Sequence, residues 1–220
     1  MKTRSPVSEK AEEFFAGYRE RHFSKGQIII FAEEIGDDVY FLEQGKIKKY
    51  TVNYKGDEVV LTIYRPGNYV PVSLVVEPHF KNRFFYAAET DVITRVVPAV
   101  DVKKWLDENP DEMFVLVRRL NRRLNEFLDR NLTFMAGTAL SRVAYEIYLE
   151  GKKFGTLEAG GLIFIDLNER DIAARTGLTR ETVNREIRKL KEVDCVKVER
   201  RGISVCDLER LEKKLYKKLL

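Results

Sequence analysis

The sequence contains few of the residues on which metal centres and disulfides depend. Its 220 residues include two cysteines, Cys195 and Cys206, and two histidines, His22 and His79. The histidines lie far from the cysteines and from each other, so the spacing offers no set of metal ligands. We predict no metal and expect the cysteines to serve as small core hydrophobes.

Long apolar runs are also missing. No stretch approaches the roughly 18 apolar residues that a membrane-spanning helix needs, so we expect no membrane partner. The first ten residues, MKTRSPVSEK, lack the apolar segment that follows the basic residues of a secretory signal. We therefore expect a cytoplasmic protein.

The positive charge is confined to one part of the chain. Residues 139–220 hold 18 basic and 14 acidic residues, a net charge of +4. Residues 1–138 then hold 39 − 18 = 21 basic and 35 − 14 = 21 acidic residues, a net charge of zero. This distribution favours a nucleic-acid partner for the C-terminal part, although a solvated charged surface has a similar composition.

Glycines divide residues 21–100 into short segments rich in β-branched and aromatic residues. The segments include QIIIF, DVYFLEQ, KIKKYTV and EVVLTIY, and glycine between them suits tight turns. The predicted turns contain Gly26, Gly36, Gly45 and Gly56. This spacing predicts a sandwich, barrel or roll. A short helix capped by Ser8 is predicted over residues 8–18.

A long helix is predicted between Pro110, which suits a first turn, and Gly137. Seven residues of this helix have the 4, 3 spacing of a heptad seam, and all but Asn131 are apolar. They are Met113, Val117, Leu120, Leu124, Phe127, Asn131 and Phe134. A strict seam favours self-pairing of the helix over packing on its own domain. Asn131 is polar, so it can fix the register or contact a ligand. A second row is expected to pack on the β domain: Leu116, Leu128, Leu132 and Met135.

Residues 168–190, NERDIAARTGLTRETVNREIRKL, have the pattern of two short helices joined at Gly177. Asn168 and Thr179 suit the two N-caps. Three apolar residues in the second helix form an inward stripe: Val183, Ile187 and Leu190. A helix over residues 141–149 precedes the pair, and a hairpin over residues 196–205 follows it. The whole pattern predicts a winged helix-turn-helix.

The outer face of the second helix carries groups that suit DNA. An arginine can bond guanine O6 and N7 together, and a carboxylate can accept from cytosine. We therefore assign base contacts to Arg180, Glu181 and Arg185, with Glu181 also able to orient Arg185 at i+4. Contacts to phosphates are assigned to Thr179, Thr182, Asn184, Arg188, Lys189 and Arg201.

The motif RETVNR, residues 180–185, resembles the recognition helix of the CRP/FNR family of bacterial transcription regulators. GDDVYFLEQGKIKKY and LTIYRPGNY are similar to the family's cyclic-nucleotide-binding β-roll. The resemblance implies an α+β fold: a β-roll (jelly roll) over residues 1–108, a dimerisation helix over 109–137 and a winged helix-turn-helix over 138–220. It also implies a homodimer on double-stranded DNA, half-sites similar to TGTGA, and RNA polymerase as a partner of an activator.

The chain departs from the family where effectors bind. Members that bind cyclic AMP carry Gly-Glu after the Pro-Gly turn, then Arg-Ser or Arg-Thr, because a buried phosphate needs such donors. Here Val70-Pro71-Val72 follows the turn, and Phe84 follows Arg83. We expect no cyclic nucleotide. Four residues remain candidates for an effector pocket: Tyr69, Val70, Arg83 and Asn131.

Other cofactors of the family are not expected either. An iron–sulfur cluster needs several cysteines, and residues 1–194 contain none. Haem needs an axial ligand, and His79 fits a loop histidine better.

Two alternatives remain for the function of the chain. It is either a regulator controlled by an unidentified effector or a constitutive regulator whose β-roll serves dimerisation or protein contact. A metalloenzyme of the cupin type would need a histidine cluster that the chain lacks, so we predict no enzyme.

Overall fold

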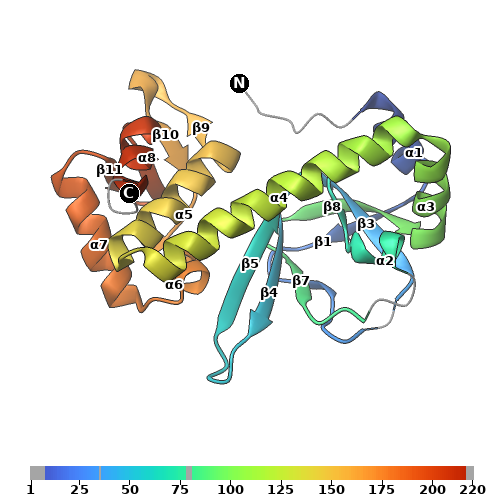
Figure 1. Ribbon diagram of the computed structural model, residues 1–220, viewed down its shortest axis with the longest axis horizontal. Helices are drawn as coiled ribbons and strands as arrows, with labels where there is room; N and C mark the ends of the chain where they lie inside the picture. Colours follow the sequence, from blue (N-terminus) through green and yellow to red (C-terminus); the bar gives the residue numbers. More distant parts are fainter. Residues whose placement is uncertain (1–7, 35, 78–80, 217–220) are drawn as a thin grey trace. The chain divides into compact units, whose positions relative to one another are not determined.

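The computed structural model of the protein describes residues 8–34, 36–77 and 81–216 (Figure 1). The chain divides within helix α4 (Pro110–Ala136) into two compact units. The N-terminal unit ends at Leu120, and the C-terminal unit begins at Asn121.

Two four-stranded antiparallel sheets form the N-terminal unit within its described residues, with orders β1-β8-β3-β6 and β2-β7-β4-β5. Glycines with positive φ stand at the predicted turns at positions 26, 45 and 56, whereas Gly36 does not have a positive φ. The strands are β1 (Arg19–Phe23), β2 (Ile28–Ile30), β3 (Asp38–Gln44), β4 (Ile47–Val52), β5 (Glu58–Tyr64), β6 (Tyr69–Val70), β7 (Phe85–Ala88) and β8 (Val92–Pro98).

In the first sheet the side chains of β3 and β6 alternate between two cores. Leu42 and Val70 contribute to the core between the sheets, whereas Phe41 and Tyr69 contribute to a second core under the helices. The helices of this unit are α1 (Glu9–Ala16), α2 (Ser73–Val76), α3 (Ala99–Glu108) and the first part of α4. In the second core Phe15 of α1 stacks on Phe41 with ring centroids 4.1 Å apart. The β-roll (jelly roll) is confirmed, and Ser8 caps α1 as predicted.

The C-terminal unit packs helices against a small sheet with the order β11-β12-β10-β9. Its helix α5 (Ala139–Phe154) is longer than the predicted helix, because residues 151–154 continue it instead of forming a loop. The other elements are β9 (Thr156–Leu157), η1 (Ala159–Gly161), β10 (Ile163–Ile165), α6 (Glu169–Thr176), α7 (Arg180–Glu192), β11 (Val196–Glu199), β12 (Gly202–Val205) and α8 (Leu208–Tyr216). Cys195 is buried in the core of this unit, as predicted.

Some residues of the predicted α4 seam also pack within their own unit. Met113 and Leu120 are half-buried against the core of the N-terminal unit. Phe134 is half-buried as well, with the guanidinium carbons of Arg130 and Arg142 5.3 and 5.4 Å from its ring centroid. Packing within its own unit thus accounts for the partial burial of each of these three side chains.

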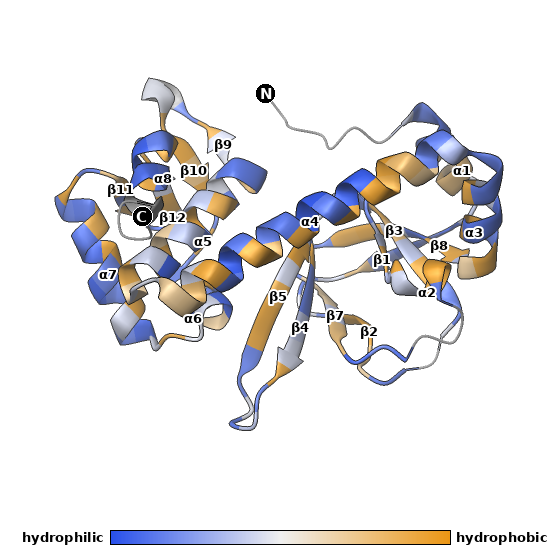
Figure 2. Cartoon of the chain, in the orientation of Figure 1, coloured by the Kyte–Doolittle hydropathy of each residue, from blue (hydrophilic) through white to orange (hydrophobic). Residues whose placement is uncertain are grey.

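Apolar and polar residues alternate along α4 (Figure 2), and several of the apolar side chains are exposed. Of the second predicted row Leu116 alone is buried; the other three are exposed instead. Phe114 and Val117 are exposed in the N-terminal unit. We call the exposed apolar residues of the C-terminal half the α4 stripe: Leu124, Phe127, Leu128, Leu132 and Met135.

Candidate nucleic-acid interface

Local hydrogen bonds fix the first helix of the pair. The Asn168 side chain accepts from the backbone N–H groups of Arg170 and Asp171, and the Asp171 carboxylate accepts from the Asn168 N–H at 3.0 Å. This reciprocal capping box satisfies N–H groups that a helix start would otherwise leave unpaired. At the other end Gly177 has φ 68° and ψ 16°, the left-handed conformation that glycine adopts at low cost.

The second helix begins directly after this turn. The Thr179 hydroxyl accepts from the Thr182 N–H at 3.2 Å, so Thr179 is the N-cap, as predicted. The inward stripe of Val183, Ile187 and Leu190 is buried in the core of the C-terminal unit. The helix is thereby held along one side, and its other side is free for a ligand.

The predicted DNA contacts of α7 share the side opposite this stripe. Thr182 is half-buried, and the others are exposed: Thr179, Arg180, Glu181, Asn184, Arg185, Arg188 and Lys189. The structure thus brings the predicted base and phosphate contacts of this helix onto one surface. Glu181 forms no ion pair with Arg185 among the described residues; the partner of Arg185 is its neighbour Glu186.

Glu186 was not among the predicted site residues. Its side chain is only 3% exposed, and it accepts hydrogen bonds from Arg185 Nε at 2.9 Å and Lys189 Nζ at 2.7 Å. Burial alone would raise the pKa of Glu186, but the bonds from Lys189 and Arg185 outweigh burial and lower its pKa. The sequence signal was an acid adjacent to one basic residue and three positions before another.

The wing follows α7, as predicted. Strands β11 and β12 pair in register from Val196 opposite Val205 to Glu199 opposite Gly202. Arg200 and the predicted phosphate contact Arg201 are exposed in the turn between them. The side chains of Ser204 and Glu199 are hydrogen-bonded across the hairpin. A basic turn at the tip of a hairpin suits contact with a phosphate backbone.

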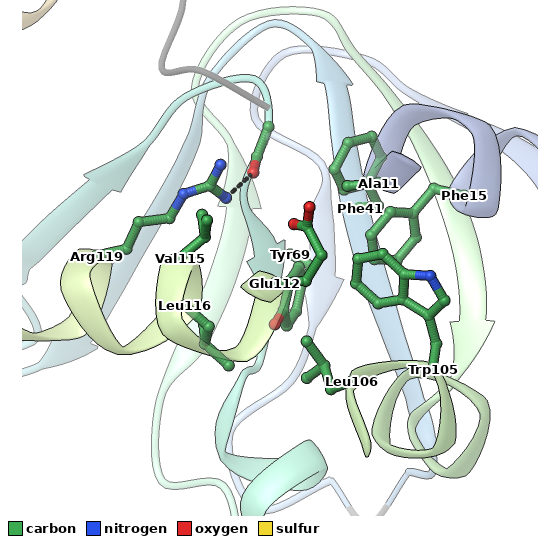
Figure 3. Close-up of a pocket in the computed structure, with 11 residues that line it drawn as sticks. Ala11, Phe15, Phe41, Tyr69, Trp105, Leu106, Glu112, Val115, Leu116 and Arg119 are labelled. Atoms are coloured by element: carbon green, nitrogen blue, oxygen red, sulfur yellow. Dashed lines mark hydrogen bonds between the residues drawn. The ribbon is translucent and has the colours of Figure 1, made fainter. Parts of the chain in front are cut away.

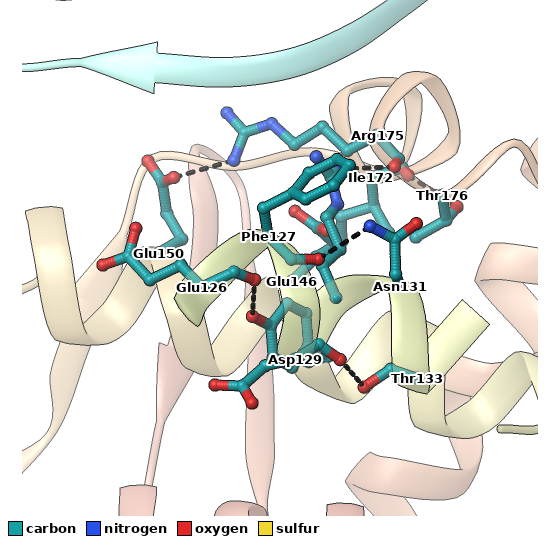
Figure 4. Close-up of polar contacts among 12 residues, drawn as sticks. Glu126, Phe127, Asp129, Asn131, Thr133, Glu146, Glu150, Ile172, Arg175 and Thr176 are labelled. Atoms are coloured by element: carbon teal, nitrogen blue, oxygen red, sulfur yellow. Dashed lines mark hydrogen bonds and ion pairs between the residues drawn. The ribbon is translucent and has the colours of Figure 1, made fainter. Parts of the chain in front are cut away.

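One ion pair connects α6 to α5, a second connects α5 to the second half of α4, and a hydrogen bond joins α4 to α6 (Figure 4). Arg175 Nη1 lies 2.7 Å from Glu150 Oε2, and Arg130 Nε lies 2.8 Å from Glu146 Oε1. Arg130 Nη2 also donates to the Arg175 carbonyl at 2.6 Å. Burial raises the pKa of Glu146, and the positive charges of Arg130 and Arg175 oppose that rise. These residues hold the helix-turn-helix on α4 and α5.

Three of the four effector candidates belong to the N-terminal unit, where they do not line one cavity. Tyr69 lines a narrow cavity between α1, α3 and the first part of α4, where the Glu112 carboxylate and Arg119 also lie (Figure 3). Val70 points instead into the core between the sheets, and Arg83 is exposed. Asn131 belongs to the C-terminal unit and donates to the Phe127 carbonyl of its own helix.

A second cavity in the N-terminal unit has an acidic lining. Glu34, Asp37 and Asp38 line it together with Asn82. Asn82 is buried at this point, and its amide nitrogen donates to the carbonyls of Phe31 and Phe84. No arginine or lysine lines this cavity among the described residues.

The sequence has two histidines, at positions 22 and 79. His79 lies outside the described residues. His22 is exposed on β1, with Nε2 2.6 Å from Glu20 Oε1. Within the described ranges, no group of three histidine, cysteine, aspartate or glutamate side chains could hold a metal ion. None of the described helices combines the length and apolarity needed to cross a membrane.

Two regions of this chain match models of known protein families. A family model for the Crp-like helix-turn-helix domain matches residues 141–214, and one for the cyclic nucleotide-binding domain matches residues 20–109. The chain is 28% identical over 200 residues to the CRP-like cAMP-activated global transcriptional regulator of Mycobacterium tuberculosis, over 87% of this chain and 86% of the relative. It is 27% identical over 185 residues to the global nitrogen regulator of Nostoc sp., over 83% of each chain.

Solved structures show the same fold. A transcriptional regulator of the CRP/FNR family from Thermus thermophilus superposes with a TM-score of 0.75 at 21% identity, over 91% of this chain and 100% of that chain. A CooA mutant from Carboxydothermus hydrogenoformans gives a TM-score of 0.76 at 21% identity, over 94% of this chain and 92% of that chain. With its β-roll, long helix and winged helix-turn-helix, the chain belongs to the CRP/FNR family of transcription regulators.

Proposed function

We propose that the protein binds a palindromic DNA operator as a homodimer, with α7 in the major groove. The observation that carries this proposal is the polar side of α7, which is exposed along the helix while the opposite side is buried. In a two-fold dimer the two copies of α7 would enter successive major grooves, roughly 34 Å apart.

Within this face we assign different tasks to different side chains. Arg180, Glu181 and Arg185 contact base edges, because two arginine forks and a carboxylate can distinguish base pairs. The remaining polar groups contact phosphates and position the helix without selecting a sequence. They are Thr179, Thr182, Asn184, Arg188, Lys189 and, on the wing, Arg201.

Selection of binding sites from a random duplex library tests the proposal. We expect the purified full-length protein to enrich a palindrome whose half-sites resemble TGTGA. Enrichment of no palindromic sequence would contradict the sequence-specific function, whereas a single unpaired half-site would contradict only the dimer.

We propose the α4 stripe as part of the dimer interface. Five large apolar side chains on one helix are otherwise exposed to water, and burial of apolar surface drives association. Leu124, Leu128 and Leu132 are four residues apart and therefore lie along one side of the helix.

We propose further that control of the protein does not pass through a cyclic nucleotide. Three carboxylates line the second cavity, and the residue buried beside it is the amide Asn82. Carboxylates repel a phosphate, which needs cationic or hydrogen-bond donors. A millimolar addition of cyclic AMP should leave the melting temperature unchanged, since only a ligand that binds the native state raises it.

The remaining assignments follow from this function. Operators lie on the bacterial chromosome, so we place the protein in the cytoplasm. If it activates transcription, its further partner is RNA polymerase.

A further inference from the structure

A buried carboxylate on a DNA-binding helix needs an explanation. Glu186 lies on the side of α7 that carries the buried Val183 and Leu190, and its charge is of the same sign as a phosphate. Both of its hydrogen-bond donors, Arg185 and Lys189, are exposed on the proposed DNA face, with side chains 64% and 50% exposed. Glu186 therefore connects the buried side of the helix to two groups on its solvated side.

The geometry of the Arg185 contact determines which donors remain for DNA. Glu186 Oε1 accepts from Nε, the guanidinium nitrogen nearest the side-chain stem. A guanidinium carries five N–H donors in a rigid fork, so this bond leaves both terminal nitrogens available. Two parallel bonds from those nitrogens match guanine O6 and N7.

We propose that Glu186 is a positioning residue, which holds Arg185 in the orientation in which it contacts a guanine. This inference rests on the proposed function, because it assumes that Arg185 contacts a base. Ordering Arg185 in the free protein lowers the side-chain freedom that is lost when DNA binds. Lys189 donates to the other carboxylate oxygen of Glu186, and its positive charge offsets the negative charge that would repel nearby phosphates.

The variant Glu186→Gln separates positioning from charge. It removes one negative charge near the DNA, so electrostatics alone would raise affinity for every duplex. If Glu186 positions Arg185, the variant should instead lose sequence discrimination at the base pair that Arg185 contacts. The ratio of affinities for the operator and for the operator changed at this pair should fall by roughly fivefold or more, which is part of the discrimination that a good arginine–guanine contact provides. The full-length protein would be titrated with its selected operator, with that operator changed at this pair, and with random duplex.

Two further variants make the comparison decisive. Glu192→Gln removes the same charge from an exposed position of the same helix, so it should strengthen binding to all three duplexes alike. In an Arg185→Ala background Glu186→Gln should leave discrimination unchanged, because Glu186 then has no base-contacting partner. If Glu186→Gln does not fold, Glu186→Asp retains the charge, withdraws the carboxylate by one methylene and should lower the same discrimination.

The outcomes distinguish this inference from the proposed function. If the wild-type protein selects an operator but Glu186→Gln shifts all three affinities as Glu192→Gln does, Glu186 does not position Arg185. If the wild-type protein selects no operator, the proposed function itself is wrong.

Discussion

Arg175 Nη1 donates a hydrogen bond of 2.7 Å to Glu150 Oε2, and both side chains are more than nine-tenths buried. Arg175 stands in the last turn of α6, immediately before the turn of the helix pair, and Glu150 stands on α5. This pair fixes the base of the helix-turn-helix on a neighbouring helix. The contribution of the pair to stability depends on both partners, because removing either one takes an opposite charge away from a buried charge.

Arg175→Ala should destabilise the protein by about 3–5 kcal/mol, since it removes the positive charge that lies 2.7 Å from the buried Glu150 carboxylate. Urea denaturation followed by circular dichroism measures the change. The double variant Arg175→Met, Glu150→Leu removes both charges and should cost clearly less. If the double variant lost as much as the single one, packing of the arginine stem and not its charge would be responsible.

Arg185→Ala and Arg188→Ala should weaken DNA binding in different ways. Arg185→Ala should cost about 1–3 kcal/mol at one base pair of the operator and little on random duplex. Arg188→Ala should weaken binding to all duplexes alike and lower the slope of log affinity against log salt by about 1. Fluorescence anisotropy titrations at several salt concentrations check both. Equal losses on operator and random duplex for both variants would refute the assignment.

Leu124→Asn should shift the protein from dimer to monomer, because it places a polar group in the proposed apolar interface. Arg122→Asn is the matched control, since Arg122 is exposed on the same half of α4 and lies outside the α4 stripe. Sedimentation velocity at micromolar concentration reports the two masses. A dimer that survives Leu124→Asn would place the interface elsewhere.

Gly177→Ala should cost about 1–2 kcal/mol, the usual penalty for a side chain in the left-handed region. The cost is conformational, because a Cβ at this position would meet nothing within 4 Å. Gly177→Asn should cost less, since asparagine tolerates this conformation. Thermal unfolding of the two variants gives the comparison, and equal losses would mean that the backbone conformation is not the cause.

The contribution of Glu186 to stability should depend on pH. Its pKa is lowered in the folded state, so its stabilisation is present above the ordinary value of about 4.5 and is lost as the pH falls through the lowered pKa. The difference in unfolding free energy between the wild type and Glu186→Gln should therefore be constant from pH 6 to 8 and shrink towards pH 3. A difference that grows on acidification would show that burial dominates and the pKa is raised.

The helix pair could be predicted from the sequence because its determinants are local. Asn168, Gly177 and Thr179 each act within about four residues, so the caps and the turn follow from residue type and spacing. Arg175 and Glu150 are 25 positions apart, and their pairing depends on how α5 and α6 pack, which no local pattern contains. The ionic contacts of the helix-turn-helix were missed for this reason.

The heptad spacing of α4 predicts a seam, but it does not predict the second contact that some seam residues make. Met113 and Leu120 have heptad spacing and also pack against the core of their own unit. Spacing alone does not reveal which neighbour an apolar side chain contacts.

The α4 stripe also has a consequence for the amount of protein in a cell. Met135 is 87% exposed in the single chain, and the dimer interface proposed for the α4 stripe would tie the paired form to mass action. On dilution the fraction of paired chains falls, and where monomers predominate the number of pairs rises with the square of the chain number. A modest change in synthesis or proteolysis would then produce a larger change in operator occupancy, without any small molecule.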